Sequence, residues 1–253
     1  MPDRNRAWEQ MGAASGLFAS FLFVVAFILF LTTQPWGGGG DPELPDIAHA
    51  ESAGAFFAFH LQAIRAQVMV SSIGIVFVLW FLGSLWVALR NGEGEPARGS
   101  SIAFAGAIVG VASVLAALVL TATCTLSTSA AQARVVPAFY TAAALFFSLG
   151  GAAFTVFFLG VAEVMLRTGA VGKWLGVLAL IAAVLSAFGF ITPYYEDGVF
   201  NAATGALGMW AHAIAFVVWL FLASVTLLVA QVRWVRARTR GENQGGAPAP
   251  GVA

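Results

Sequence analysis

Residues 11–33 read MGAASGLFASFLFVVAFILFLTT, a stretch without a single charged side chain. An α-helix rises about 1.5 Å per residue, so a run of this length crosses the roughly 30 Å hydrocarbon core of a lipid bilayer. Five further apolar runs of comparable length follow along the chain, at residues 66–89, 102–123, 140–166, 174–191 and 207–232. We therefore predict an all-α, polytopic membrane protein with six transmembrane helices.

The overall composition favours the same class. Hydrophobic residues make up 60% of the chain and charged residues 9%, and the mean hydropathy is +0.87. A soluble globular domain carries about 25% charged residues. The formal net charge is zero, so nothing favours a nucleic-acid partner. Cys124 is the only cysteine, which excludes an internal disulfide and a metal site built on paired cysteines.

Basic residues mark one side of the predicted membrane domain. If the N-terminus is cytoplasmic and six helices alternate, ten of the 12 lysines and arginines fall on the cytoplasmic side, and only Arg65 and Arg134 fall outside. The ten are Arg4, Arg6, Arg90, Arg98, Arg167, Lys173, Arg233, Arg236, Arg238 and Arg240. Because positive charge is retained in the cytoplasm during insertion, we predict that both termini are cytoplasmic.

The chain then divides into three parts. These are a cytoplasmic N-terminus (residues 1–10), the six-helix transmembrane domain (11–232) and a cytoplasmic tail (233–253) that is first basic and then disordered. The tail arginines could attract anionic lipid by about 1 kcal/mol each. Anchoring of the last helix at the cytoplasmic face explains them equally well.

One sequence pattern occurs twice. Residues 81–92 and 158–169 both read F-L-G-x-x-x-V-x-L-R-x-G, and both close a predicted span on the same side of the membrane. One interpretation is a duplicated helical hairpin, since parallel repeats occur in membrane transporters. The other is convergence, because any helix end favours an arginine in its last turn and a glycine just beyond it. Gly106 and Gly110 form a separate small-residue notch that predicts close helix packing.

The segments around the second span carry two further predictions. Residues 48–90 contain no proline, so we predict a continuous or slightly broken helix, with a separate interfacial helix before the span as the alternative. Residues 91–96, NGEGEP, are predicted to form a cytoplasmic loop.

Polar residues inside or beside the spans are the candidates for function, because they are costly in hydrocarbon. Glu163 and Arg167 lie one helical turn apart and predict a structural ion pair near the cytoplasmic face. The other candidates fall in the outer half of the membrane, where they predict an outward-facing polar pocket that binds a ligand. They are His60, Arg65, Gln67, Cys124, Tyr195, Glu196, Asp197 and His212.

The two histidines raise the question of a cofactor. His60 and His212 on different helices could ligate a haem, or could hold a divalent metal together with Glu196 or Asp197. The sequence has no HxxxH or ExxH spacing within a span, and a lone histidine in a helix bundle more often bonds to a neighbouring helix. We therefore predict no cofactor and leave a metal site open. No motif of a nucleophilic or zinc hydrolase occurs, so we name no catalytic residue.

Two segments carry a family resemblance. VGKWLGVLALIAAVLS at residues 171–186 and WLFLASVTLL at residues 219–228 resemble a large group of uncharacterised integral membrane proteins of high-GC actinobacteria. The resemblance covers mainly the last two helices. It implies the bacterial inner membrane as the location, and it implies no reaction.

Together these features favour a non-enzymatic membrane protein. It would be an accessory or structural subunit, or a protein that binds a small ligand in its outward-facing pocket. The alternatives are a secondary transporter for a small solute and a haem or metal redox protein that uses His60 and His212. Association with itself or with another chain is open.

Overall fold

The structure, a computed structural model, describes residues 2–33, 45, 49–127 and 133–243, and of residues 2–9, 133 and 231–243 it describes only the backbone. The α-helices of this part are α1 (Pro2–Leu31), α2 (Ala53–Phe59), α3 (Leu61–Glu93), α4 (Arg98–Leu126), α5 (Val136–Thr168), α6 (Lys173–Ala187) and α7 (Ala211–Asn243). No strand occurs in these residues. The prediction of an all-α fold is confirmed.

Short 3₁₀ and π segments join the long helices. The 3₁₀ helices are η1 (Ala50–Ser52), η2 (Ala133–Val135), η3 (Phe188–Phe190), η4 (Thr192–Tyr194) and η5 (Gly198–Phe200), and η6 (Ala206–Trp210) is a π-helix. Six segments of the described chain are long and apolar enough to cross a membrane: Gln10–Leu31, Leu61–Glu93, Arg98–Leu126, Val136–Thr168, Lys173–Tyr194 and Ala206–Ala230. The prediction of six helices long and apolar enough to cross a membrane is confirmed for the described residues.

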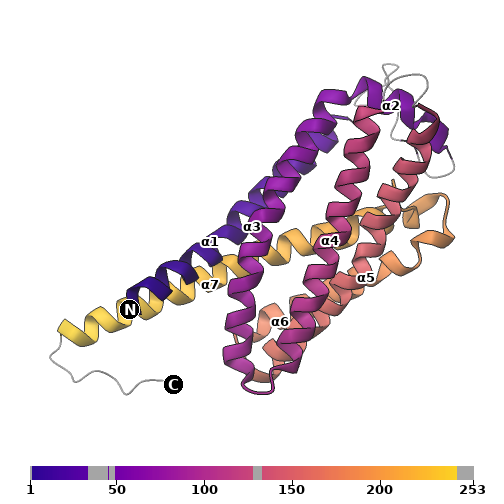
Figure 1. The fold of residues 1–253 in the computed structure, drawn as a ribbon. Helices are drawn as coiled ribbons and strands as arrows, with labels where there is room; N and C mark the ends of the chain where they lie inside the picture. The colour runs from indigo at the N-terminus through magenta and orange to yellow at the C-terminus, as the bar shows by residue number, and fades with distance from the viewer. Residues whose placement is uncertain (1, 34–44, 46–48, 128–132, 244–253) are drawn as a thin grey trace.

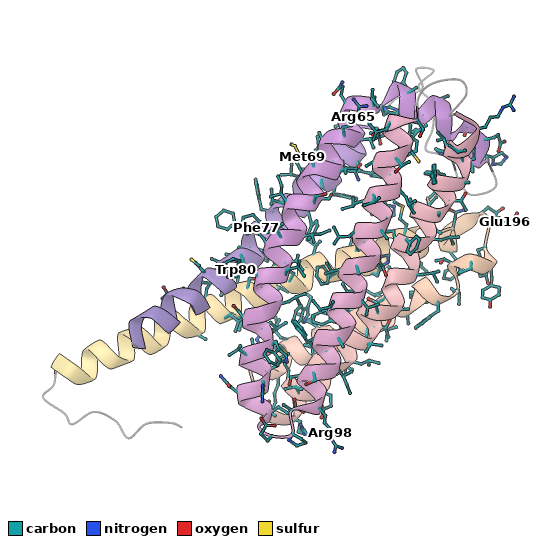
Figure 2. All side chains as sticks on the ribbon, viewed as in Figure 1. Arg65, Met69, Phe77, Trp80, Arg98 and Glu196 are labelled. Atoms are coloured by element: carbon teal, nitrogen blue, oxygen red, sulfur yellow. The ribbon has the colours of Figure 1, made fainter. Side chains whose placement is uncertain are left out.

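The helices form an elongated bundle with two distinct ends (Figure 1). The α3–α4 and α5–α6 connections lie at the lower end, which we call the Glu93 end. Helix α2 and the chain between α6 and α7 lie at the other, which we call the α2 end. Figure 2 shows Arg65 and Glu196 at the α2 end and Arg98 at the Glu93 end. Between these ends, exposed apolar side chains such as Met69 and Trp80 project outward from α3, as lipid contact requires.

The boundaries of α2 and α3 can be compared with the predictions for residues 48–96. The proline-free segment is divided into separate helices: α2 ends at Phe59, and α3 begins at Leu61 after His60. Helix α2 lies across the end of the bundle (Figure 1), which is closer to the alternative prediction of a short helix before the span. The predicted loop at 91–96 begins later than expected. Helix α3 continues to Glu93 and stops at Gly94, whose φ of 74° lies in the left-handed region that favours glycine.

Glycines bring α4 and α5 into backbone contact. A Cβ atom added at Gly106 would lie 2.6 Å from the backbone nitrogen of Phe157, and one at Gly160 would lie 2.8 Å from that of Ala103. A Cβ atom added at Gly110 would lie 2.9 Å from the ring of Phe154 on α5. The predicted small-residue notch at 106 and 110 therefore packs against α5. Close packing of this kind holds helices together in lipid, where apolar surface alone gives no preference for protein over lipid tails.

A cluster of aromatic rings packs in the buried core near the Glu93 end. Trp219 of α7 packs edge-on against Phe157 and Phe158 of α5, with ring centroids 5.5 and 5.7 Å apart. The Trp219 indole nitrogen donates a hydrogen bond of 3.2 Å to the carbonyl of Leu175 on α6. This one side chain therefore joins three helices, and its polar atom is satisfied inside the bundle.

The two copies of the repeated pattern sit in different surroundings. Gly160 touches α4, whereas the position of a Cβ at Gly83 is open, with nothing within 4 Å. The final glycines differ too: Gly169 ends α5 with φ 75°, but α3 continues past Gly92. The duplication stays a prediction, and the packing of the two copies is not equivalent.

This difference gives a matched pair of substitutions. Gly160→Ala should destabilise the protein by about 1–3 kcal/mol, because the new methyl overlaps the backbone of α4. Gly83→Ala should change the stability by less than about 1 kcal/mol, since its site is open. Reversible unfolding in mixed detergent micelles measures both. Equal effects of the two substitutions would contradict the α4–α5 contact.

Candidate functional site

An internal cavity of about 470 Å³ lies in the half of the bundle near the α2 end. It is enclosed by α1, α3, α4, α5 and α7, and its walls are mostly phenylalanine, valine, isoleucine, leucine and alanine. No Asp, Glu, Lys or Arg is among the described residues that line it. The polar residues in the lining are Thr33, Gln67, Ser71, Thr121, Tyr140 and His212. We call this cavity the chamber.

Helix α2 covers the chamber at the α2 end. Phe56 and Phe57 are buried and line the cavity, and the Phe57 ring meets the Tyr140 ring edge-on at 6.0 Å. The Tyr140 hydroxyl donates a hydrogen bond to the carbonyl of Pro45, which ties the chain before α2 to α5. These contacts close the α2 end of the chamber with aromatic rings.

The connection between α6 and α7 completes this cover, and Asn201 organises it. The Asn201 side-chain oxygen accepts hydrogen bonds from the backbone nitrogens of Ala203 (2.7 Å) and Thr204 (3.0 Å), and its amide nitrogen donates to the carbonyl of Glu196. Ser148 of α5 donates a 3.0 Å hydrogen bond to the carbonyl of Ala202. The segment is thereby fixed against α5, and Ala203 forms part of the chamber wall.

His212 is the most unusual group in the chamber. It follows the π-helix Ala206–Trp210, and π-helical turns frequently occur at functional sites. The side chain is 1% exposed and lies 5.0 Å from the Phe147 ring, measured between centroids. Neither ring nitrogen has a hydrogen-bond partner among the described residues. The backbone of Phe147 is close to the ring, but it falls short of hydrogen-bond geometry.

An unpartnered buried imidazole is costly. Leaving a buried donor or acceptor unsatisfied costs about 1–3 kcal/mol, and almost all buried polar groups in proteins are paired for this reason. His212 is among the residues that line the chamber, but both ring nitrogens are buried away from its open space.

The predicted ligand-binding residues separate into three groups. Gln67 and His212 line the chamber. His60, Arg65 and Cys124 lie nearby at the α2 end but do not line it. His60 sits between the rings of Phe56 and Phe59, at 4.8 and 4.9 Å. Arg65 donates a 3.1 Å hydrogen bond to the carbonyl of Thr125, and Cys124 is buried against α5, its sulfur 3.8 Å from the carbonyl of Val136.

Tyr195, Glu196 and Asp197 form the third group. All three are exposed on the α6–α7 connection, and none lines the chamber. The Tyr195 ring packs on Phe200 at 5.2 Å, on the outside of the cover. The structure therefore does not bring the acidic residues into the chamber beside His212, and the described lining is mostly apolar where the sequence predicts a polar pocket.

A metal site finds no support in this geometry. Within the described ranges, no group of three or more His, Cys, Asp or Glu side chains is close enough to hold an ion. Of the two histidines, only His212 lines the chamber.

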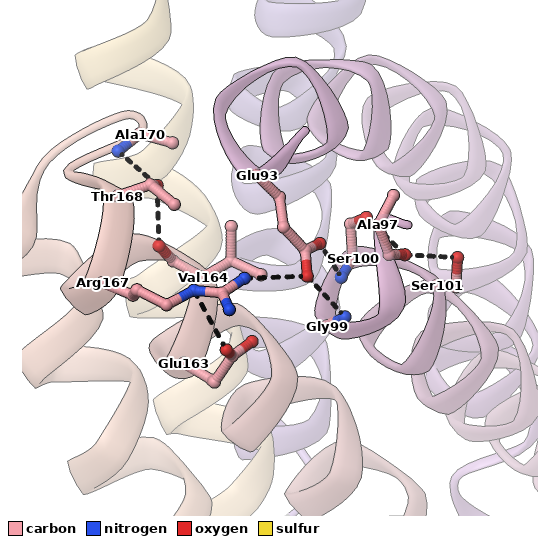
Figure 3. Close-up of polar contacts among 10 residues, drawn as sticks. All are labelled: Glu93, Ala97, Gly99, Ser100, Ser101, Glu163, Val164, Arg167, Thr168 and Ala170. Carbon is pink, nitrogen blue, oxygen red and sulfur yellow. Dashed lines mark hydrogen bonds and ion pairs between the residues drawn. The ribbon is translucent and has the colours of Figure 1, made fainter. Parts of the chain in front are cut away.

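A polar cluster at the Glu93 end involves the predicted ion pair (Figure 3). The Arg167 Nε lies 3.3 Å from a Glu163 carboxylate oxygen, and its terminal nitrogen lies 3.1 Å from Glu93. Glu93, with only 5% of its side chain exposed, accepts hydrogen bonds of 2.9 Å from the backbone nitrogens of Gly99 and Ser100. The sequence reasoning missed Glu93, which satisfies free N–H groups at the start of α4 and so joins α3, α4 and α5.

Removing this carboxylate should cost stability. Glu93→Ala should lower the free energy of unfolding by about 1–2 kcal/mol, because the first turn of α4 loses its acceptor. Glu95→Ala is the control: its ion pair with Arg90 is exposed on both sides, and surface pairs contribute about 0–1 kcal/mol. Thermal unfolding in detergent compares the two variants. A larger loss from Glu95→Ala would rule out the capping role of Glu93.

The chain was also compared with proteins already known. No protein-family model, curated protein or solved structure matches it. The chamber and its residues are therefore the basis for the functional proposal.

Proposed function

We propose that this protein binds a neutral, largely apolar small molecule inside the membrane, in the chamber. The observation that carries the proposal is a cavity of about 470 Å³ with no charged residue in its described lining. Pockets for small molecules usually measure about 300–1,000 Å³ and combine apolar walls with a few polar groups. A charged ligand would have no residue of opposite charge in the described lining to offset the free-energy cost of its desolvation.

Binding is better supported than catalysis or transport. His212 is the one imidazole in the lining, and no carboxylate of the described lining accompanies it as an acid or base partner. Transport of a small solute stays an alternative prediction. An accessory role within a larger assembly is compatible with ligand binding.

We further propose an orientation with both termini in the cytoplasm, in a bacterial cytoplasmic membrane. This orientation is supported by the basic residues, of which ten fall on the proposed cytoplasmic side and two on the outer side. An even number of candidate spans also brings both termini to one side. The Glu93 end would then face the cytoplasm and the α2 end the outside. The tail arginines would lie beside the anionic lipids of the inner leaflet.

The orientation has a direct test. A reporter that works only in the cytoplasm should be active when it is fused after Arg240, since positive charge holds this end inside. A reporter that works only in the periplasm should be inactive at the same position. A matching fusion after Thr33 should give the opposite result. Periplasmic activity of the Arg240 fusion would overturn the orientation, while the chamber would be unaffected.

The binding proposal is tested by photolabelling from the bilayer. We expect a diazirine-bearing dodecanol, dissolved in liposomes that contain the protein, to label buried chamber residues such as Ala117 and Ala144. Ala117→Phe should reduce labelling of Ala144 at least about fivefold by filling the cavity. Ala112→Phe, on the exposed face of the same helix, should not. Peptide mass spectrometry locates the label, and labelling confined to lipid-facing residues would refute binding in the chamber.

A further inference from the structure

The polar residues of the chamber are gathered toward one end of it. All six polar residues of the described lining lie in or next to the helix segments nearer the α2 end; they are Thr33, Gln67, Ser71, Thr121, Tyr140 and His212. Nearer the Glu93 end the described lining is apolar, with Val78 of α3, Val111 of α4, Phe154 of α5 and Phe216 of α7. The wall of the chamber is therefore amphipathic along the bundle axis.

Four of the six polar side chains offer no donor to a molecule in the chamber. The hydroxyls of Thr33 and Thr121 donate to the carbonyls of Phe30 and Ala117, at 2.6 and 2.9 Å. The Tyr140 hydroxyl donates to the carbonyl of Pro45. The ring nitrogens of His212 are buried away from the open space. Only Gln67 and Ser71 remain among the described lining residues.

Gln67 and Ser71 keep their full hydrogen-bonding capacity. Neither side chain makes a hydrogen bond with a described residue, and the polar atoms of both retain accessible surface, unlike the nitrogens of His212. A serine inside a helix usually bonds back to the preceding turn. Ser72 does so, with a 2.8 Å hydrogen bond to the carbonyl of Val68. The neighbouring Ser71 does not, so its hydroxyl is available to a ligand.

The face of α3 shows where these two side chains point. Residues three, four or seven apart share one face of a helix. Gln67 and Ser71 share theirs with three buried residues that also line the chamber, Ile64, Ile75 and Val78. Met69 and Trp80 belong to the opposite face and project outward (Figure 2). The free polar atoms of Gln67 and Ser71 therefore belong to the chamber side of α3.

The two side chains together define a complementary group. Residues four apart on a helix are neighbours, with Cβ atoms roughly 5–6 Å apart. A glutamine amide offers two N–H donors and a carbonyl acceptor, and a serine hydroxyl offers one donor and an acceptor. A hydroxyl or a primary amide, which both donates and accepts, can pair with either side chain. Such pairing offsets the cost of holding polar groups in apolar surroundings.

We propose that the ligand is a neutral amphiphile whose hydroxyl or amide head group bonds to Gln67 and Ser71, with its alkyl chain directed toward Phe154 and Phe216. This proposal rests on the proposed function and names the class of its ligand and the orientation in which it lies. The lining of α3 continues from Ser71 to Val78, about 10 Å at 1.5 Å per residue. An alkyl chain thus has an apolar wall along it beyond the polar pair.

Recognition of the head group is tested with dodecanol and dodecane that each carry a diazirine at one chain end, in the alcohol the end away from the hydroxyl. In liposomes, wild-type protein should be labelled at buried chamber residues at least about threefold more by the alcohol than by the alkane, because the hydrogen bonds favour the alcohol. Labelling of Val119, which is 63% exposed on α4 and does not line the chamber, corrects for the amount of each probe in the bilayer.

A pair of double variants isolates the two side chains. Gln67→Leu with Ser71→Ala should abolish the preference for the alcohol, while labelling by the alkane shows that the chamber is intact. Gln62→Leu with Ser72→Ala makes the same changes on the same helix at residues that do not line the chamber, and it should keep the preference. A preference that survives in the first variant would overturn recognition by Gln67 and Ser71.

The orientation is tested by moving the diazirine along the alcohol. At the chain end it should label Val111 and Phe154, and beside the hydroxyl-bearing carbon it should label Ala117 and Ala144. The reverse pattern would overturn the orientation. Equal interior labelling of the wild type by alcohol and alkane would overturn head-group recognition and leave binding in the chamber intact. Absence of interior labelling by every probe would instead refute the proposed function.

Discussion

Close packing of helices at glycine is the constraint on which the rest of the structure depends. Gly106 and Gly160 hold α4 against α5, and Gly16 holds α1 against α7. In lipid there is no hydrophobic force to bring apolar helices together, so such close contacts and a few hydrogen bonds must do it. These contacts lie toward the Glu93 end. Toward the α2 end, α1 meets the start of α7 through the rings of Phe27, Phe30 and Trp210, while α4 stays against α5 through Cys124 and Val136.

Each end of the bundle is then closed by a different kind of interaction. At the Glu93 end, one nearly buried carboxylate joins the ends of α3, α4 and α5 through hydrogen bonds and an arginine. At the α2 end, Asn201 folds the α6–α7 connection over the cavity, and Tyr140 ties down the chain before α2.

The sequence predicts the spans well because lipid imposes one rule on every helix that crosses it, namely about 20 apolar residues. It predicts much less of the site. Helical periodicity tells which residues share a face of one helix, as with Gln67 and Ser71, but not which other helix that face meets. Hence Gln67 and His212 both line one cavity, while Tyr195, Glu196 and Asp197 lie outside it. Glu93 was missed because its neighbours, Gly92 and Gly94, read as a loop, and its partners are set by the packing of α5 against α4.

An apolar chamber inside a membrane cannot select its ligand by apolarity. An alkyl chain that leaves the bilayer for the chamber exchanges one hydrocarbon environment for another, so burial from water contributes nothing to this step. What differs between the two environments is the fit to the walls and the few polar side chains of the lining, such as Gln67 and Thr121. A hydroxyl or carbonyl deep in the bilayer has few partners, and a hydrogen bond between groups in a membrane contributes about 1–2 kcal/mol. That is roughly a tenfold preference, which makes a polar contact with the lining the main source of selectivity in an otherwise permissive cavity.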